Sequence, residues 1–268
     1  MDYNLPELPC RPLDSNKGTF GKILNIAGSK YMPGAAYISS VAAMTAGCGL
    51  VCLMSEESVI KAVSAQSPII TFAPLSELEE KLRTFTVLLI GCGLSTSDEA
   101  VNIFKRAIEN SKIPTIIDAD GLNILAKNQI TLPTDTILTP HPLEAARLIG
   151  CDLDNVLSDT EKAAREICAR YNCVTVLKSH ETIVTDGEKI FKNTTETSAL
   201  AKGGSGDVLA GVIASLTAQG LELFDAAALG VYLHGLSGDL AAKNLTEYCV
   251  TANDTIRFLP TAFINYAK

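Results

Sequence analysis

Short apolar runs alternate with longer segments of mixed polarity along most of the chain. Residues 86–90 form a near-continuous apolar run, which is typical of a strand buried on both faces of a parallel sheet. The longer segments place apolar residues at helical spacing. This alternation predicts an α/β fold with a mostly parallel central sheet. The expected strands are residues 22–28, 49–55, 86–90, 114–118, 136–138 and 174–177, and the expected helices are the segment after Pro33 and residues 56–67, 122–126, 144–148 and 161–171.

The later part of the chain departs from this alternation. Asp186-Gly187 separates residues 182–185 from residues 189–192 and predicts a β-hairpin, which gives the sheet an antiparallel edge. Residues 223–242 predict a long helix, in which we interpret His234 as a structural residue.

Both ends of the chain lie outside the alternating pattern. Residues 1–17 contain Pro6, Pro9 and Pro12, and they predict an extended arm that packs on the body of the protein or on a neighbouring subunit. This stretch lacks the charged start and apolar core of a signal peptide. The tail beyond Thr251 predicts one more helix.

Composition narrows the class of protein. The 268 residues are 47% hydrophobic and 19% charged, which predicts a compact globular protein, and we expect one domain over residues 1–268. The net charge of −8 and the lack of a basic cluster argue against nucleic acid or an anionic membrane as the main partner. No apolar run reaches the ~18 residues of a membrane helix. Eight cysteines without a C-x-x-C pair indicate buried thiols in a reducing compartment, so the cytoplasm is the expected location.

The most specific chemical pattern is residues 202–211, KGGSGDVLAG, which lead into an apolar helical segment. The glycines allow several amide N–H groups to converge just before the helix, and a helix N-terminus attracts anions such as phosphate. Asp207 stands in the first helical turn beside this point. It either stabilises the helix dipole or acts as a general base toward a hydroxyl that attacks phosphorus. The glycines before it favour the second role.

Two familiar motifs are excluded by their spacing. The chain contains no Gly-x4-Gly-Lys-Ser/Thr sequence, so it has no conventional P-loop. Ser205 does not fit an esterase nucleophile elbow, because Asp207 occupies the position where the elbow needs a glycine.

Further polar loops follow the expected strands at their carboxyl ends, where open α/β sheets bind ligands. Residues 91–95, Gly-Cys-Gly-Leu-Ser, lack the third glycine of the dinucleotide fingerprint. Asp118 and Asp120 are suited to bind Mg²⁺ or a substrate hydroxyl, or to cap the next helix. Prolines on both sides of His141 direct it toward a cleft. Lys178 is either a ligand of a nucleotide phosphate or an exposed loop lysine.

The order of these loops resembles the ribokinase-like superfamily and, within it, the ADP- or ATP-dependent NAD(P)H-hydrate dehydratases. The resemblance covers the chain from Lys17 through the final helices, and it implies a ribokinase-like three-layer α/β/α sandwich. The motifs that carry it are residues 17–22 (KGTFGK), 28–31 (GSKY) with 34–36 (GAA), 118–120 (DAD), 139–142 (TPHP) with Glu144, and 203–211 (GGSGDVLAG).

The resemblance implies that the hydroxyl of the S-epimer of hydrated NADH or NADPH is phosphorylated by ADP or ATP, after which phosphate leaves and NAD(P)H is restored. Asp207 would deprotonate the hydroxyl, and the amides of Gly204, Ser205 and Gly206 would hold the transferring phosphoryl group. Mg²⁺ would shield the polyphosphate, with no metal ligand assigned among the residues. The positions matched to the hydrated dinucleotide are Ala36, Gly93, His141 and Asp207, and those matched to the adenine nucleotide are Lys178, Ser179, His180, Glu181, Thr182, Ala199, Leu200, Ala201, Lys202, Gly203, Gly204, Ser205 and Gly206.

The resemblance also implies a homotetramer and, since no epimerase domain precedes the dehydratase region, a separate NAD(P)H-hydrate epimerase as a functional partner. Some loops depart from the family pattern: Cys92 replaces a proline, and Leu143 and Ser179 replace glycines. Two other functions remain open, namely a small-molecule kinase of the same superfamily and a nucleotide-binding sensor without turnover. The motif at 139–142 favours the dehydratase over the kinase, and the retained Asp207 argues against the sensor.

Overall fold

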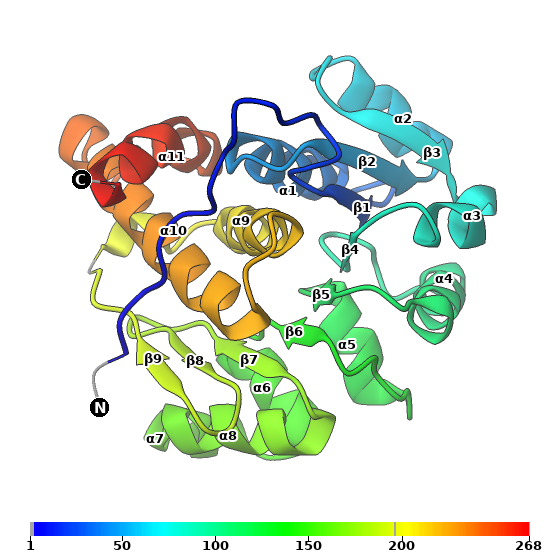
Figure 1. Cartoon of the computed structure of the whole chain (residues 1–268). Coiled ribbons are helices and arrows are strands. Elements are labelled where there is room, and N and C mark those ends of the chain that lie inside the picture. Colours follow the sequence, from blue (N-terminus) through cyan, green and yellow to red (C-terminus); the bar gives the residue numbers. More distant parts are fainter. Residues whose placement is uncertain (1–2, 196, 268) are drawn as a thin grey trace.

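A nine-stranded sheet forms the centre of the protein (Figure 1). The computed structural model describes residues 3–195 and 197–267. Strands β1 to β7 pair in parallel in the order β3-β2-β1-β4-β5-β6-β7, and β8 and β9 add an antiparallel edge beside β7. The strands are β1 (Lys22–Ile26), β2 (Leu50–Ser55), β3 (Thr71–Pro74), β4 (Val87–Ile90), β5 (Thr115–Ile117), β6 (Thr136–Leu138), β7 (Val174–Leu177), β8 (Ile183–Thr185) and β9 (Ile190–Lys192).

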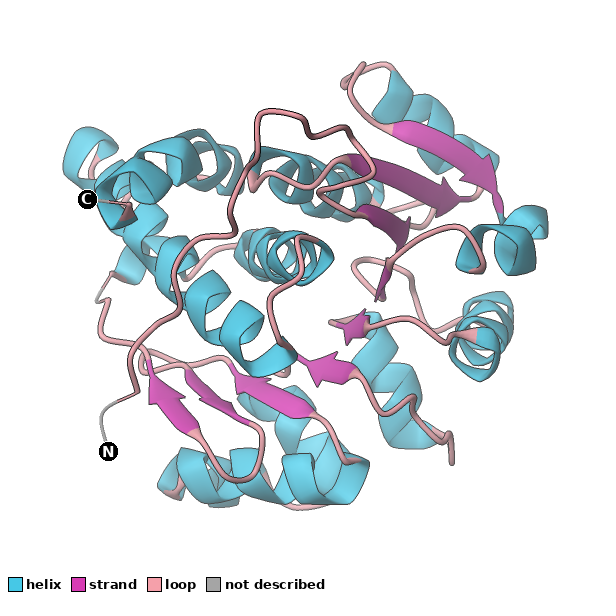
Figure 2. Cartoon of the chain, in the orientation of Figure 1, coloured by secondary structure: helices cyan, strands magenta, loops and turns pink. Residues whose placement is uncertain are grey.

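Helices cover both faces of the sheet, as Figure 2 shows. Helices α1, α2, α9 and α10 share a core with one face, α3 to α8 share a core with the other, and α11 packs on α10. This arrangement confirms the predicted three-layer α/β/α fold. The helices are α1 (Pro33–Thr45), α2 (Glu57–Ser64), α3 (Leu78–Leu82), α4 (Asp98–Asn110), α5 (Asp120–Lys127), α6 (Pro142–Ile149), α7 (Leu153–Ser158), α8 (Thr160–Tyr171), α9 (Ser205–Ala218), α10 (Leu223–Leu245) and α11 (Ala252–Tyr266), with short 3₁₀ turns at Leu75–Glu77 and Ser198–Leu200.

Strand β4 explains why the central strands read as unbroken apolar runs. Its side chains alternate between the two faces of the sheet. Leu88 and Ile90 enter the core under α4 and α5, while Val87 and Leu89 enter the core under α1 and α9. Because both faces are covered by helices, each position must be apolar.

The expected strands and helices all form, with ends that shift by a few residues, and the hairpin at Asp186-Gly187 is confirmed as β8 and β9. The structure adds elements that the sequence analysis did not identify, namely β3, α3, α4 and α7. Among the described residues, no helix combines the length and the apolarity that crossing a membrane would require.

The amino-terminal arm packs on the body of the protein, which was one of its two expected positions. The Tyr3 hydroxyl donates to Asp225 at 2.6 Å, and the Tyr3 ring meets the Phe224 ring edge-on. The Tyr266 hydroxyl donates to the carbonyl of Pro6 at 2.6 Å. These contacts fasten residues near the start of the chain to α10 and α11.

Close packing between α1 and α9 sets the position of the glycine-rich loop. A side chain at Gly211 would overlap the Ser39 carbonyl, so glycine allows the two helix backbones to approach. Buried Asn25 in β1 donates to the Ser39 and Ser40 hydroxyls at 2.9 Å, which ties α1 to the middle of the sheet. The N-terminus of α9 is therefore held against the carboxyl end of the sheet.

Candidate active site

The N-terminus of α9 presents unpaired amide groups. Gly204 precedes the helix with φ +91°, a backbone conformation that favours glycine. The N–H groups of Gly204, Gly206 and Asp207 have no backbone acceptor in the part of the chain that the structure describes, whereas the Ser205 N–H donates to the Lys202 carbonyl at 3.3 Å. Of the amides predicted to hold a phosphoryl group, those of Gly204 and Gly206 are thus free of backbone acceptors among the described residues, whereas that of Ser205 is engaged.

The buried Asp118 and the partly exposed Lys178 form an ion pair at the same edge of the sheet. Asp118 follows β5, Lys178 follows β7, and the ammonium nitrogen lies 2.7 Å from a carboxylate oxygen. The Thr139 hydroxyl donates to the same oxygen at 2.7 Å. Burial by itself would raise the pKa of Asp118, but the Lys178 charge and these hydrogen bonds hold that pKa below its usual range. Asp118 is therefore an ionised partner of Lys178 and does not cap α5.

Lys178 faces the glycine-rich loop as well as Asp118. Its ammonium nitrogen lies 3.3 Å from where a side chain at Gly206 would begin, so a larger residue there would crowd the ammonium. Burial would lower the pKa of Lys178, but the charges of Asp118 and Glu144 raise it. A permanent positive charge therefore lies beside the free amides of α9, where it can stabilise a phosphoryl group.

Asp207 is a carboxylate whose protonation changes near neutral pH. Burial, followed by the negative charge of Asp118, raises the pKa of Asp207 to about 7. The Cys92 thiol and the carboxylate oxygens of Asp118 and Asp207 lie within 4.8 Å of one another. A carboxylate that changes protonation near pH 7 has the property required of a general base.

Cys92, Asp118 and Asp207 form a poor site for Mg²⁺. Mg²⁺ prefers oxygen ligands in an octahedral arrangement. One of the three groups here is a thiol, whose pKa burial raises well above its ordinary value, and Asp118 is already paired with Lys178. Among the described residues, this cluster thus leaves the Asp207 carboxylate as its one oxygen ligand outside the ion pair, which is fewer than Mg²⁺ takes.

His141 and Asp120 have structural partners. His141 is the N-cap of α6: its Nδ1 accepts from the Leu143 and Glu144 amides, and its own amide donates to the Glu144 carboxylate at 2.9 Å. Burial raises the pKa of Glu144 to about 7. Asp120 accepts from the Ser95 amide at 2.8 Å, so it fixes the loop after β4 instead of capping α5.

A cavity of about 620 Å³ opens beside Lys178 and Gly206, and we call it the first cavity. His141 lies at its wall. The residues matched to the adenine nucleotide that line it are Lys178, Ser179, His180, Thr182, Leu200, Ala201, Lys202, Ser205 and Gly206.

The other residues matched to the adenine nucleotide do not line the wall of the first cavity in the same way. Glu181 lines an adjoining hollow with His180, Ala199 is 1% exposed, and Gly203 and Gly204 do not line the cavity. The Lys202 ammonium lines the wall, but it donates to the Tyr248 and Val250 carbonyls at 2.6 Å each. Lys202 thus ties the loop to the segment before α11, which limits its freedom to bind phosphate.

Several cavity residues were missed by the sequence analysis, and His234 is the most informative. Although we interpreted it as structural, His234 lines the first cavity, is 7% exposed, and has an Nε2 without a hydrogen-bond partner among the described residues. Burial lowers its pKa to about 4, so the ring is neutral at pH 7. Asn193, Thr195 and Thr197, from the loop after β9, line the same wall.

Ala36 and Gly93, the other residues matched to the hydrated dinucleotide, are both buried. Ala36 is 0% exposed in α1, so its methyl group faces protein. Gly93 has φ +61°, and a side chain there would meet Ala35 and Met32. The amide of Gly28 donates to the carbonyl of Cys92 at 2.8 Å, which joins the turn after β1 to the loop after β4.

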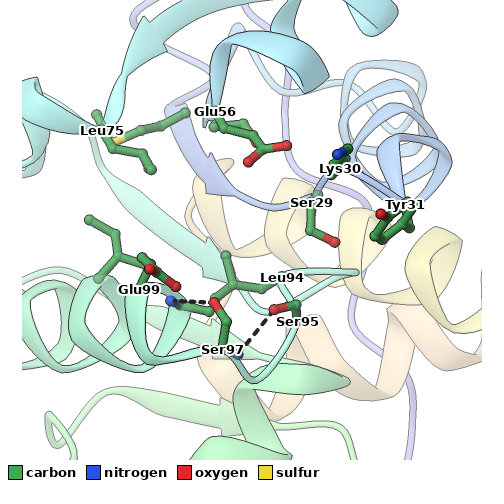
Figure 3. A pocket seen from close by; sticks show the side chains of 14 residues that line it. Ser29, Lys30, Tyr31, Glu56, Leu75, Leu94, Ser95, Ser97 and Glu99 are labelled. Atoms are coloured by element: carbon green, nitrogen blue, oxygen red, sulfur yellow. Dashed lines mark hydrogen bonds between the residues drawn. The ribbon is translucent and has the colours of Figure 1, made fainter.

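A second cavity, of about 260 Å³, opens between these two joined segments (Figure 3). Leu94 and Ser95 line it, only a few residues after Cys92, whose thiol reaches Asp118 and Asp207. Lys178, which lines the first cavity, contacts the carboxylate of Asp118, whereas Leu94 of the second cavity follows Cys92 by two residues in the sequence.

Comparisons with known proteins show which family the chain belongs to. A family model described as NAD(P)H-hydrate dehydratase matches residues 23–261. The ADP-dependent (S)-NAD(P)H-hydrate dehydratase of Neisseria meningitidis is 39% identical over 87% of this chain and 81% of its own length. The bifunctional NAD(P)H-hydrate repair enzyme Nnr of Moorella thermoacetica is 35% identical over 97% of this chain, which spans 52% of that relative.

A solved structure gives the same result. The ADP/ATP-dependent NAD(P)H-hydrate dehydratase of Bacillus subtilis, co-crystallised with ATP and Mg²⁺, is 30% identical and superposes with a TM-score of 0.86. The match covers 97% of this chain and 95% of that one. The resemblance inferred from the loops of the sequence is therefore confirmed.

Proposed function

Because the chain belongs to the NAD(P)H-hydrate dehydratase family, we propose that it converts the S-epimer of hydrated NADH or NADPH back to NAD(P)H, using ADP or ATP as phosphoryl donor. The observation that carries the proposal is the position of Asp207. Its carboxylate, with a pKa of about 7, stands in the first turn of α9 among amides without backbone acceptors, next to Gly206, which lines the first cavity.

In the first half of the reaction, Asp207 accepts the proton of the ring hydroxyl, and the hydroxyl oxygen attacks the terminal phosphorus of the nucleotide. The new oxygen–phosphorus bond forms as the bond to the leaving AMP or ADP breaks. The Gly204 and Gly206 amides and the Lys178 ammonium stabilise the charge on the transferring group. Mg²⁺ bound to the nucleotide would neutralise part of the polyphosphate charge.

In the second half, the carbon–oxygen bond breaks and its electron pair leaves with phosphate, while the lone pair of the ring nitrogen forms a carbon–nitrogen double bond. The adjacent ring carbon then releases a proton. The electrons of the broken carbon–hydrogen bond form the ring double bond, and the electrons of the carbon–nitrogen double bond return to the nitrogen as its lone pair. Hydrated dinucleotide and ADP thus give NAD(P)H, phosphate, AMP and a proton.

The first cavity supplies the site for the adenine nucleotide. Most of the residues matched to the nucleotide line it, and the cavity ends at the free amides of α9, which favours a phosphate at that end. The unpaired Nε2 of buried His234 provides a further hydrogen-bonding position for the nucleotide.

The proposal includes three features of the working enzyme: a homotetramer, a cytoplasmic location, and a separate NAD(P)H-hydrate epimerase as functional partner. The bifunctional name of the M. thermoacetica relative, of which this chain spans about half, supports pairing between a dehydratase and a second repair activity.

The test is recovery of the absorbance of reduced nicotinamide when purified protein is mixed with hydrated NADH or NADPH, Mg²⁺ and either ADP or ATP. We expect recovery that requires a nucleotide, and the faster nucleotide identifies the donor. Transfer of phosphate to a stable alcohol without recovery would favour the small-molecule kinase. Nucleotide binding without any turnover would favour the sensor.

A further inference from the structure

The second cavity occupies the point of the sheet where the strand order changes direction. β1 lies between β2 and β4, because the chain builds β2 and β3 on one side of β1 and then returns to β4 on the other. Crevices outside the carboxyl ends of strands at such a point are where open α/β sheets bind nucleotides. The residues after β1, β2 and β4 line the cavity, among them Ser29, Glu56 and Ser95.

Glu56 has the position of a ribose-binding carboxylate. It directly follows β2, which pairs in parallel with β1, and β1 leads into the glycine turn at Gly28. In dinucleotide-binding folds, an acidic residue at the end of the second strand accepts hydrogen bonds from ribose hydroxyls. Glu56 does not bond to the amides of its own helix, and its described partner is the hydroxyl of Ser58. Figure 3 shows its carboxylate directed toward the centre of the lining side chains.

The charge of this cavity is unsuited to a phosphate. Glu56 and Glu99 are its acidic lining residues, and Lys30 is its basic one. A hydrogen bond from the Glu99 amide and then one from Ser97 hold the pKa of Glu99 below its usual range, so it is ionised at neutral pH. The Ser97 hydroxyl also accepts from the Ala100 amide at the start of α4, which occupies one of the donors that an anion would need.

We propose that the second cavity binds the ribose of the unreactive half of the dinucleotide, with Glu56 accepting from its hydroxyls, and that the enzyme therefore prefers NADH-hydrate to NADPH-hydrate. This inference rests on the proposed dehydratase function. The two dinucleotides differ in a 2′-phosphate on that ribose, and Glu56 and Glu99 repel this phosphate.

The experiment compares kcat/KM for the two hydrates, and calorimetric Kd values for the stable products NADH and NADPH, in the wild-type protein and in Glu56→Gln. The wild type should favour the NADH form by about tenfold or more in both measurements. Glu56→Gln should reduce this ratio several-fold, because the amide accepts from a ribose hydroxyl without repelling phosphate.

Glu57→Gln is the matched control, because it removes the same charge one residue further on, from a side chain that pairs with Lys61 and does not line this cavity. The preference of Glu57→Gln for the NADH form over the NADPH form should equal that of the wild type. Equal affinity of the wild type for NADH and NADPH, lack of binding of either, or a ratio unchanged in Glu56→Gln would overturn the inference. If neither hydrate is converted with ADP or ATP, the proposed function fails, and the two Kd values still decide whether the cavity discriminates.

Discussion

The ammonium nitrogen of Lys178 lies 2.7 Å from the carboxylate of Asp118, and this pair joins the ends of two strands that are 60 residues apart in sequence. The same ammonium lies beside Gly206, and the same carboxylate lies beside Asp207 and Cys92. One ion pair therefore sets both the positive charge near the phosphoryl position and the negative charge that helps to raise the pKa of the proposed base.

Replacing Lys178 tests how far the site depends on this pair. Lys178→Met leaves the buried Asp118 carboxylate without its cation, so we expect the free energy of unfolding to fall by about 3–5 kcal/mol. Urea unfolding of this variant and of Lys112→Met, which changes an exposed lysine, provides the comparison. The control should stay within about 0.5 kcal/mol of the wild type. Equal free energies of unfolding for the two variants would show that the charge of Lys178 does not stabilise the buried Asp118 carboxylate.

The rate of the first chemical step should depend on pH through Asp207. Its pKa of about 7 means that the base is protonated and inactive below that pH, so kcat/KM should rise with pH and level off above about 7. Glu144 also has a pKa of about 7, and Glu144→Gln separates the two groups while keeping an oxygen acceptor for the His141 amide. The pH profile should persist in this variant, and its disappearance would assign the ionisation to Glu144.

His234 should contribute to nucleotide affinity. His234→Phe keeps a ring of similar shape but removes the unpaired Nε2, and we expect the Kd for ADP or ATP to rise about three- to tenfold. Ser237→Ala is the control, since its hydroxyl bonds to the His234 carbonyl within the same helix and does not line the first cavity. The Kd values are measured by calorimetric titration. The same Kd for His234→Phe and the wild type would show that His234 is a structural residue.

Packing between α1 and α9 should be sensitive to one methyl group. Gly211→Ala forces a side chain into the Ser39 carbonyl, and the expected loss is about 1–3 kcal/mol of stability. Gly34→Ala in α1 meets no atom within 4 Å and should be neutral or stabilising by up to about 1 kcal/mol. Thermal or urea unfolding of both variants measures the difference. Similar stabilities would mean that the helices separate without cost.

The sequence was sufficient to predict most strands and helices, though not β3, α3, α4 and α7, and the gathering of loops at one edge of the sheet. Parallel strands place their carboxyl ends together, so residues after β5, β6 and β7 had to meet. The sequence also contained a signal for the amphipathic helix α4, because its buried residues follow helical spacing. These residues are Ala100, Ile103, Phe104 and Ala107, and the sequence analysis did not identify the helix.

The pattern of the sequence could not predict which side chains contact each other across the fold. Asp118 was expected to bind Mg²⁺, bind a substrate hydroxyl or cap a helix, and its ion pair with Lys178 depends on how two distant strands are spaced. His234 lies in a helix with many buried neighbours, and only the position of the loop after β9 makes it part of a cavity. The capping role of His141 did leave a local signal, because Pro142 and Glu144 follow it at the spacing of a helix start.

The most direct test of the account is the turnover of Asp207→Asn, measured as recovery of reduced nicotinamide absorbance, together with its Kd for ADP and ATP. We expect unchanged nucleotide binding and a loss of about 10²–10⁴ in rate, the usual contribution of general base catalysis. Turnover at the wild-type rate would contradict the central claim that Asp207 removes the proton from the hydroxyl that attacks phosphorus.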